Sequence, residues 1–228
     1  MYKELGIKKE ILELSKKIEK EIQEQFNKVE QIKEINSLKV LEAFQDCRLS
    51  EMHLQSSTGY GIDESGRNKI EEIYARIFKT EDSLVRAQLI SGTHALAVTL
   101  SALLRPGDTM LSISGAPYDT LQTIIGISQE ESKSSLKAYG IKYEQIDLIN
   151  DEFDIKSIKE RLIKQDIKLI EIQRSKGYST RKSLTINKIE KVIKAIREVD
   201  KKVIIMVDNC YGEFVEEKEP TEVGADII

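Results

Sequence analysis

The segment Val203-Ile204-Ile205-Met206-Val207-Asp208-Asn209 decides the interpretation of the fold. Five aliphatic residues in succession are typical of a strand that is buried on both faces, as in a parallel sheet. A helical pattern with inward-facing Ile and Val side chains precedes it over 186–199. A helix followed by a buried strand that ends in a carboxylate indicates an α/β protein with polar groups at the carboxyl edge of its sheet.

The same alternation extends back along the sequence as far as residue 84. It predicts an α/β fold, with a mostly parallel sheet and helices on both faces. We expect strands at 84–90, 109–112, 141–146, 168–172 and 202–207. We expect helices at 94–104, which we predict to be buried, and at 118–127, 132–139, 154–164 and 186–199.

The N-terminal third has a different pattern. Apolar residues three and four positions apart predict an amphipathic helix over 7–35. The apolar face is expected to pack on its own domain or on a partner subunit. A long free coiled coil is the least favoured interpretation, because the steps drift from a strict heptad. Further helices are expected at 38–44 and 68–78, with a turn-rich loop at 56–67 between them.

We therefore divide the chain into a helical segment, 1–83, and an α/β domain, 84–228. Gly224-Ala225-Asp226 is typical of the turn before a strand, and Ile227-Ile228 of the start of that strand. A domain seldom ends two residues into a buried strand, because such a strand supplies few ladder hydrogen bonds. We therefore expect the domain to be incomplete at its C-terminus and the chain to be a fragment.

Composition excludes several classes of protein. The 35 basic and 39 acidic residues give a net charge of −4, which does not support nucleic-acid binding. Two cysteines, Cys47 and Cys210, and two histidines give neither a disulfide framework nor metal-ligand spacing. The apolar stretch 95–104 is about half a membrane span. The N-terminal residues alternate charges with aliphatics, so we expect no secretory signal. We expect a cytoplasmic protein with no metal, membrane or nucleic-acid partner.

The first candidate site is Ser91-Gly92-Thr93, between a predicted strand and a predicted helix. Unpaired N–H groups and the positive end of the helix dipole favour an anion there, and two hydroxyls add donors. The segment therefore suits a phosphate group. The alternative is an ordinary N-cap.

Three further candidates follow other predicted strands. Asp208 ends a buried strand, so its carboxylate needs a cationic partner, unless it caps the next loop. Tyr118 has a ring that suits stacking on a flat ligand, unless it is a packing residue. Arg174 and Arg181, near Gln173, suit a substrate carboxylate, unless they belong to a solvated basic loop.

All four candidates follow strands, so we expect them at one edge of the sheet. Together they would provide an anion site, a stacking ring, polar donors and a buried carboxylate. Pyridoxal 5′-phosphate requires this set, because it carries a phosphate, a flat ring, a ring hydroxyl and a ring nitrogen.

Several motifs resemble those of the methionine gamma-lyase-like family, also called aluminium resistance proteins. The motifs are Thr58-Gly59-Tyr60-Gly61 with Asp63, Gly66 and Arg67, Ser91-Gly92-Thr93-His94-Ala95, Arg105-Pro106-Gly107-Asp108, Gly115-Ala116-Pro117-Tyr118-Asp119-Thr120, Gln173-Arg174-Ser175-Lys176-Gly177-Tyr178 and Val207-Asp208-Asn209-Cys210-Tyr211-Gly212-Glu213-Phe214. The resemblance runs from about residue 38 to the end. It implies a pyridoxal-phosphate enzyme of fold type I, with a large domain like that of aspartate aminotransferase.

The resemblance also implies roles for individual residues. Gly92 and Thr93 would hold the cofactor phosphate, Tyr118 would stack on the ring, and Asp208 would pair with the ring nitrogen. Gln173 or Ser175 would approach the ring hydroxyl. Tyr60 lies where related enzymes extend a loop into a neighbouring subunit's site, which implies a homodimer or homotetramer.

The family's catalytic lysine forms a Schiff base with the cofactor and follows the Gly-Ala-Asp turn. Lys218 precedes that turn, and Lys176 precedes the Asp208 strand. We therefore expect the catalytic lysine beyond Ile228 and the chain alone to be inactive. The family name implies carbon–sulfur bond elimination from an amino-acid substrate. The alternatives are an α/β protein that binds another phosphorylated ligand at Ser91–Thr93 and a non-catalytic assembly protein.

Overall fold

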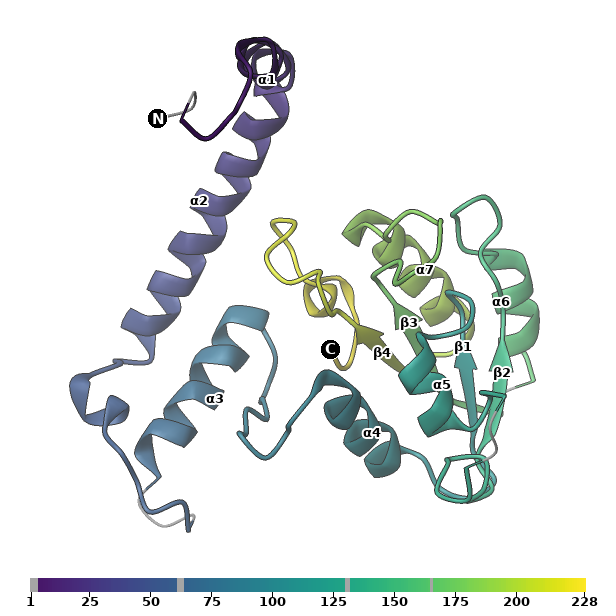
Figure 1. The fold of residues 1–228 in the computed structure, drawn as a ribbon. Coiled ribbons are helices and arrows are strands. Elements are labelled where there is room, and N and C mark those ends of the chain that lie inside the picture. Colours follow the sequence, from purple (N-terminus) through teal and green to yellow (C-terminus); the bar gives the residue numbers. More distant parts are fainter. Residues whose placement is uncertain (1–3, 61–63, 130–131, 165) are drawn as a thin grey trace.

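The computed structural model describes residues 4–60, 64–129, 132–164 and 166–228. Figure 1 shows a helical arm beside an α/β unit. The arm contains α1 (Lys9–Glu21), α2 (Gln23–Asp46), the short 3-10 helix η1 (Glu51–Leu54) and α3 (Ser65–Phe78). The α/β unit contains α4 (Gly92–Leu103), β1 (Thr109–Ser112), α5 (Asp119–Ile125), β2 (Lys142–Gln145), α6 (Ile155–Leu162), β3 (Ile167–Gln173), α7 (Ile186–Val199), β4 (Ile204–Asp208) and the 3-10 helix η2 (Pro220–Val223).

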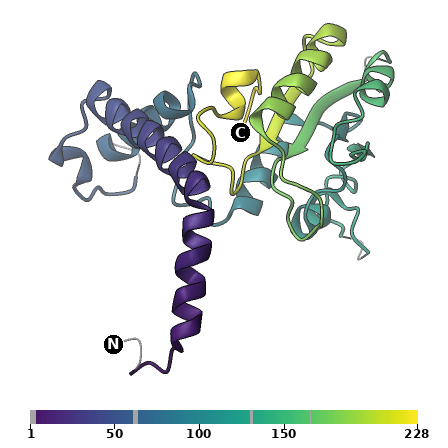
Figure 2. The same ribbon diagram turned by 90° about the horizontal axis from the view of Figure 1, so that it is seen from above.

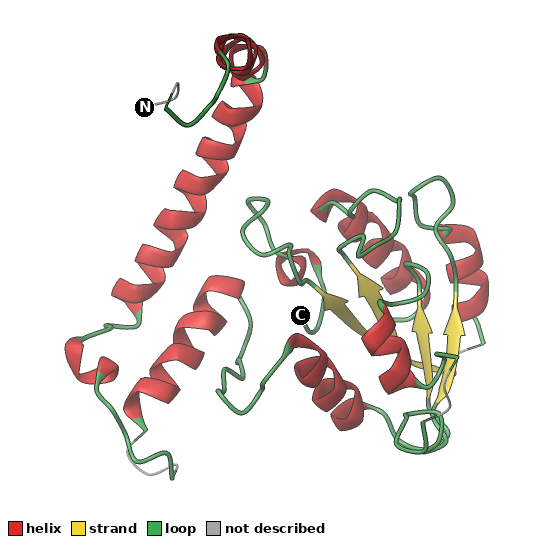
Figure 3. Ribbon diagram, in the orientation of Figure 1, coloured by secondary structure: helices red, strands yellow, loops and turns green. Residues whose placement is uncertain are grey.

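The four strands form a parallel sheet in the order β2-β1-β3-β4, drawn as yellow arrows in Figure 3. One apolar cluster joins the sheet to α6 and α7, and a second joins the opposite face to α4 and α5. The aliphatic runs in β3 and β4 face these two clusters alternately, which explains why both faces are apolar. The prediction of an α/β fold with helices on both faces is confirmed. Ile227 also forms a parallel bridge with Met206, as expected for the start of a further strand.

Residues 84–90 do not form the expected strand. Leu84 and Ile90 are 60% and 83% exposed, and the Val85 N–H donates to Glu71 Oε1 instead of to a strand. The expectation of a strand here is therefore wrong, because the segment pairs with no strand among the described residues. It connects α3 to α4 as a loop.

Two helix predictions are also wrong in detail. Residues 132–139 form turns, and the Leu136 N–H donates to the Ile124 carbonyl at 2.9 Å instead of completing a helix. The helix expected over 7–35 is divided at Ile22, and its second part continues as α2 through the separate helix expected at 38–44. In α4, which was expected to be buried, Leu100 is buried and most other side chains are partly exposed.

The arm is stabilised by a small apolar cluster between α2 and α3, which consists of Ala43, Cys47, Ile73 and Ile77. By contrast, α1 buries no residue, and Figure 2 shows it extending away from the rest of the molecule. Its apolar side chains Ile11, Leu14 and Ile18 are exposed. Packing on its own domain is therefore not the arrangement of α1 in this structure, and packing on a partner subunit stays a prediction.

Across the described ranges, no helix combines the length and apolarity needed to cross a membrane. The same residues contain no cluster of histidine, cysteine and acidic side chains suited to a metal ion.

Gly126 ends α5 with a left-handed backbone, φ +91°, and a Cβ added there would lie 2.4 Å from Ser135 Oγ. We expect Gly126→Ala to lower the free energy of unfolding by about 2–3 kcal/mol, from backbone strain plus overpacking. Gly107→Ala is the matched control, because Gly107 has φ +97° and no atom within 4 Å of its added Cβ. Urea unfolding should give a smaller loss for the control, and equal losses would contradict the steric argument.

Candidate functional site

The carboxyl ends of β3 and β4 place Gln173 and Asp208 side by side. These residues are the last register pair of the two strands, and both are buried. The loop after β1 reaches the same edge, because the Tyr118 N–H donates to Gln173 Oε1 at 2.7 Å. The edge therefore combines a carboxylate, an amide and a tyrosine, as expected from the sequence.

The start of α4 lies against the beginning of α5. Thr93 Oγ1 is 3.1 Å from the Tyr118 hydroxyl and 3.0 Å from Thr120 Oγ1. The first backbone hydrogen bond of α4 is donated by the Ala95 N–H to the Ser91 carbonyl at 3.0 Å. Gly92 and Thr93 lie before this donor, in the first turn of the helix. Amides at a helix N-terminus next to three hydroxyls are a suitable site for a phosphate group.

Ser91 acts as the N-cap of α4, because its Oγ accepts the His94 N–H at 3.1 Å. The capping alternative for this residue is thus confirmed, and its hydroxyl proton stays available for a ligand. Sequence reasoning missed Thr120 as a third hydroxyl, although it stands two residues after Tyr118.

Asp208 is 6% exposed, and burial raises the pKa of its carboxyl. Its Oδ1 accepts the Cys210 N–H at 3.1 Å, so part of the capping alternative is realised. No ion pair to Asp208 is found among the described residues, and the nearby Glu213 charge raises its pKa further. A protonated ring nitrogen would supply the cationic partner that this carboxylate lacks.

Gln173 connects several parts of the site. Besides accepting from Tyr118, its Nε2 donates to the Ser175 carbonyl at 3.1 Å, and its backbone N–H donates to Ser114 Oγ at 2.8 Å. These bonds fix the loop that carries the Tyr118 ring against the end of β3.

A pocket of about 610 Å³ opens beside Tyr118 and Gln173. Arg181 lines it and donates to the carbonyls of Gln173 and Lys182, each at 2.9 Å. Burial lowers the pKa of the Arg181 guanidinium. The other lining residues are Ser114, Gly115, Ala116, Pro117, Asp119, Gln122, Asp147, Leu148, Asn150, Asp151, Lys176, Gly177, Tyr178, Ser179 and Thr180.

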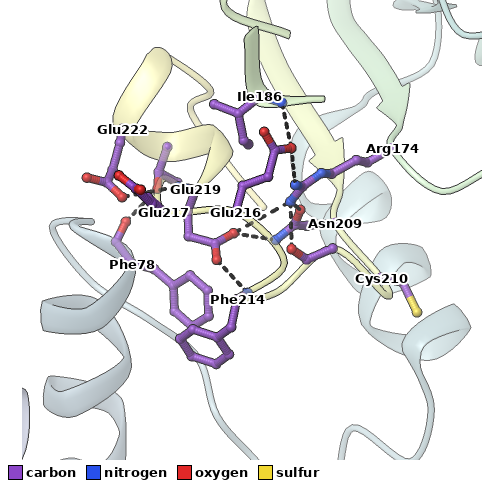
Figure 4. Close-up of polar contacts among 12 residues, drawn as sticks. Phe78, Arg174, Ile186, Asn209, Cys210, Phe214, Glu216, Glu217, Glu219 and Glu222 are labelled. Carbon is purple, nitrogen blue, oxygen red and sulfur yellow. Dashed lines mark hydrogen bonds and ion pairs between the residues drawn. The ribbon is translucent and has the colours of Figure 1, made fainter. Parts of the chain in front are cut away.

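Arg174 does not line this pocket. It is 3% exposed, and its guanidinium bonds to Asn209, to the Gly212 carbonyl and to Glu216, as Figure 4 shows in part. The structure thus places Arg174 in a buried ion-pair network instead of near a substrate. These partners are acidic and amide groups well separated from it in the sequence, so no local pattern could have revealed them.

Tyr60 is 88% exposed and lies in the loop before α3, while its neighbours 61–63 lie outside the described residues. Figure 1 shows the N-terminal end of α3, which follows this loop, on the arm and away from the sheet. The structure therefore does not bring Tyr60 to the site of its own chain.

Sequence reasoning also missed a buried carboxyl beneath this edge. Glu171 is fully buried within β3, and its Oε2 lies 2.6 Å from Ser112 Oγ. A single acidic residue inside the aliphatic run 169–172 was the available signal.

The sequence matches the family model described as methionine gamma-lyase over residues 11–228. Two similar solved structures cover 99% of the chain. A Clostridium acetobutylicum protein described as involved in aluminium resistance is 50% identical, with a TM-score of 0.95 and 55% of that chain covered. A carbon–sulfur lyase involved in aluminium resistance from Clostridium novyi NT is 44% identical, with a TM-score of 0.93 and 54% covered.

The Bacillus subtilis protein YnbB is 46% identical over 201 residues, which are 88% of this chain and 48% of YnbB. The chain thus spans about half the length of the relatives it matches. The pyridoxal-5′-phosphate-dependent protein YhfS of Escherichia coli is 18% identical, with a TM-score of 0.65 over 86% of this chain and 49% of YhfS. That likeness concerns the fold, which is fold type I of pyridoxal-phosphate enzymes.

Proposed function

Because the chain belongs to the methionine gamma-lyase family, we propose that it forms the cofactor-binding part of a pyridoxal-phosphate-dependent carbon–sulfur lyase. The observation that carries the proposal is the Asp208 carboxylate, which is buried beside Gln173 and has no cationic partner in the described part of the chain. A protonated ring nitrogen is the group that such a carboxylate requires.

The residues at this edge fit the cofactor. Gly92, Thr93 and Thr120 would bind its phosphate, and the Tyr118 ring would stack on its pyridine ring. Asp208 would hold a proton on the ring nitrogen, and Gln173 would orient the loop that carries Tyr118. When bound, the cofactor supplies an electron sink for breaking bonds to an amino acid.

The substrate proposal rests on the pocket. Arg181 and Lys176 line it together with Asp119, Asp147 and Asp151, and these two cationic residues are the candidate groups for a substrate carboxylate. We therefore propose an amino acid with a sulfur leaving group as the substrate of the whole protein. We also propose a homodimer or homotetramer, which the exposed apolar side chains of α1 support.

The binding proposal is tested by titrating the 228-residue chain with pyridoxal 5′-phosphate and following its absorbance. We expect Asp208→Ala to weaken binding about 10–100-fold, because a hydrogen bond to a charged group contributes about 1.5–3 kcal/mol. Asp46→Ala is the matched control, since Asp46 pairs with Arg76 on the surface of the arm. Equal affinities of the two variants would overturn the role of Asp208. Displacement of the cofactor by a nucleotide would favour another phosphorylated ligand.

We propose that the catalytic lysine is not one of these 228 residues. Lys176 lines the pocket, which makes it the alternative candidate. It stands before β4 in the sequence, whereas the family's catalytic lysine is expected after β4. Incubation with the cofactor, treatment with borohydride and peptide mass spectrometry should show no selective labelling of Lys176. Selective labelling there would overturn this part of the proposal.

A further inference from the structure

Glu171 lies directly beneath the candidate cofactor site. Side chains alternate along β3, so Leu169, Glu171 and Gln173 share one face of the sheet. Glu171 pairs with Met206, and Gln173 pairs with Asp208. Leu169 and Met206 belong to the apolar cluster under α4 and α5, so the Glu171 carboxyl is enclosed between that cluster and the site.

The hydrogen bonds of Ser112 specify where a proton resides. Ser112 Oγ is 2.7 Å from the Gly115 carbonyl oxygen and 2.6 Å from Glu171 Oε2. A hydroxyl donates one proton, and a carbonyl oxygen can only accept. Both contacts are hydrogen bonds when Ser112 donates to Gly115 and Glu171 donates to Ser112. This arrangement requires a protonated Glu171.

The surroundings of Glu171 favour the same protonation state. Glu171 is 0% exposed, and its Oε1 atom has no hydrogen-bond partner among the described residues. An ionised carboxylate in this position would be desolvated without compensation. Burial has the largest effect on the pKa of Glu171 and raises it, and the nearby Asp208 charge raises it as well. The Arg181 charge lowers this pKa, and a Ser112 hydroxyl that donated to an ionised Glu171 would also lower it. Tyr143 is the other titratable group near this carboxyl.

We propose that Glu171 is a positioning residue that stays protonated at neutral pH and, through Ser112, holds the Gly115–Tyr118 loop against the end of β3. The Gly115 carbonyl begins this loop, and the Tyr118 N–H ends it on Gln173. A second consequence rests on the proposed function. A neutral Glu171 leaves Asp208 as the charged member of the pair, which is the form that binds a protonated ring nitrogen.

Infrared difference spectroscopy on the 228-residue chain tests the protonation. The wild type at pH 6.5 should show the carbonyl band of a protonated carboxylic acid, and Glu171→Gln should remove it. Glu160→Gln, at an exposed position on α6, is the matched control and should keep the band. If Glu171→Gln leaves the band unchanged, the proposal is overturned.

Hydrogen exchange tests the positioning role independently of any cofactor. Glu171→Gln keeps a donor for Ser112 and should preserve slow exchange of the Tyr118 N–H. Glu171→Leu and Ser112→Ala interrupt the chain of bonds and should lose that protection. Circular dichroism should show that both variants remain folded. Unchanged protection of the Tyr118 N–H in both variants would overturn the positioning role.

Cofactor affinity tests the part that rests on the proposed function. From pH 6.5 to pH 9 the wild type should lose more affinity than Glu171→Gln, because an ionised Glu171 disfavours the charged form of Asp208. Equal losses in the two proteins would overturn the link to Asp208. If no variant binds the cofactor, the proposed function fails, while the infrared and exchange results still decide the role of Glu171.

Discussion

Replacing Arg174 by methionine is expected to lower the free energy of unfolding by about 3–5 kcal/mol, the usual cost of removing one member of a buried ion pair. The Arg174 Nη atoms donate to Asn209 Oδ1 at 2.7 Å and to Glu216 Oε1 at 2.8 Å, and lie 3.8 Å from Glu219 Oε2. Glu219 is 0% exposed, so its carboxylate would lose its nearest cation without gaining water.

The same substitution should loosen the contact between the arm and the α/β unit. The segment 209–222, which Figure 4 shows around Arg174, also contacts the arm. The Phe214 and Phe78 rings lie 5.6 Å apart, and Asn36 Nδ2 donates to the carbonyls of Phe214 and Glu216. Faster proteolysis between α3 and α4 should therefore accompany the loss of stability.

Urea unfolding followed by circular dichroism measures the effect. Arg76→Met is the matched control, because Arg76 is 52% exposed in a surface ion pair with Asp46. Its loss should be small, since exposed ion pairs contribute little. A loss for Arg174→Met no greater than that of the control would show that the network does not stabilise the fold. Arg174→Lys should be intermediate, because lysine keeps the charge but not the planar fork.

The second large effect is a fall in stability as the pH rises from about 5 to 8. Burial raises the pKa of Glu171 from 4.5 in a free side chain to about 8. In this window the unfolded chain has lost the proton, but the folded chain still holds it. The free energy of unfolding should therefore decrease by about 1.4 kcal/mol per pH unit from this residue alone.

Glu171→Gln should remove that slope, because glutamine does not titrate. The difference between the unfolding free energies of wild type and variant should be largest, in favour of the wild type, near pH 5. It should shrink steadily to about pH 8 and level off above it. A difference that is constant with pH would contradict the raised pKa. Asp208, whose pKa burial also raises, contributes a slope of the same sign in both proteins.

Local sequence patterns were sufficient to predict most helices and strands of the α/β unit. The aliphatic run of β4 and the inward face of α7 were recognisable, because burial on one or both faces imposes a periodicity on neighbouring residues. The grouping of Tyr118, Gln173 and Asp208 could be predicted from the predicted strands that they follow or end, because parallel strands end at one edge of a sheet.

Only the tertiary structure decided which side chains of the α/β unit become hydrogen-bond or ion-pair partners. It left residues 84–90 as a loop, because none of the strands that the structure describes pairs with them. It placed Arg174 on Asn209 and Glu216, which are 35 and 42 residues away, and Glu171 on Ser112, 59 residues away. Burial periodicity repeats over a few residues and is visible in any short window. The hydrogen bonds of a buried charge depend on how distant segments pack, and no short window contains both partners.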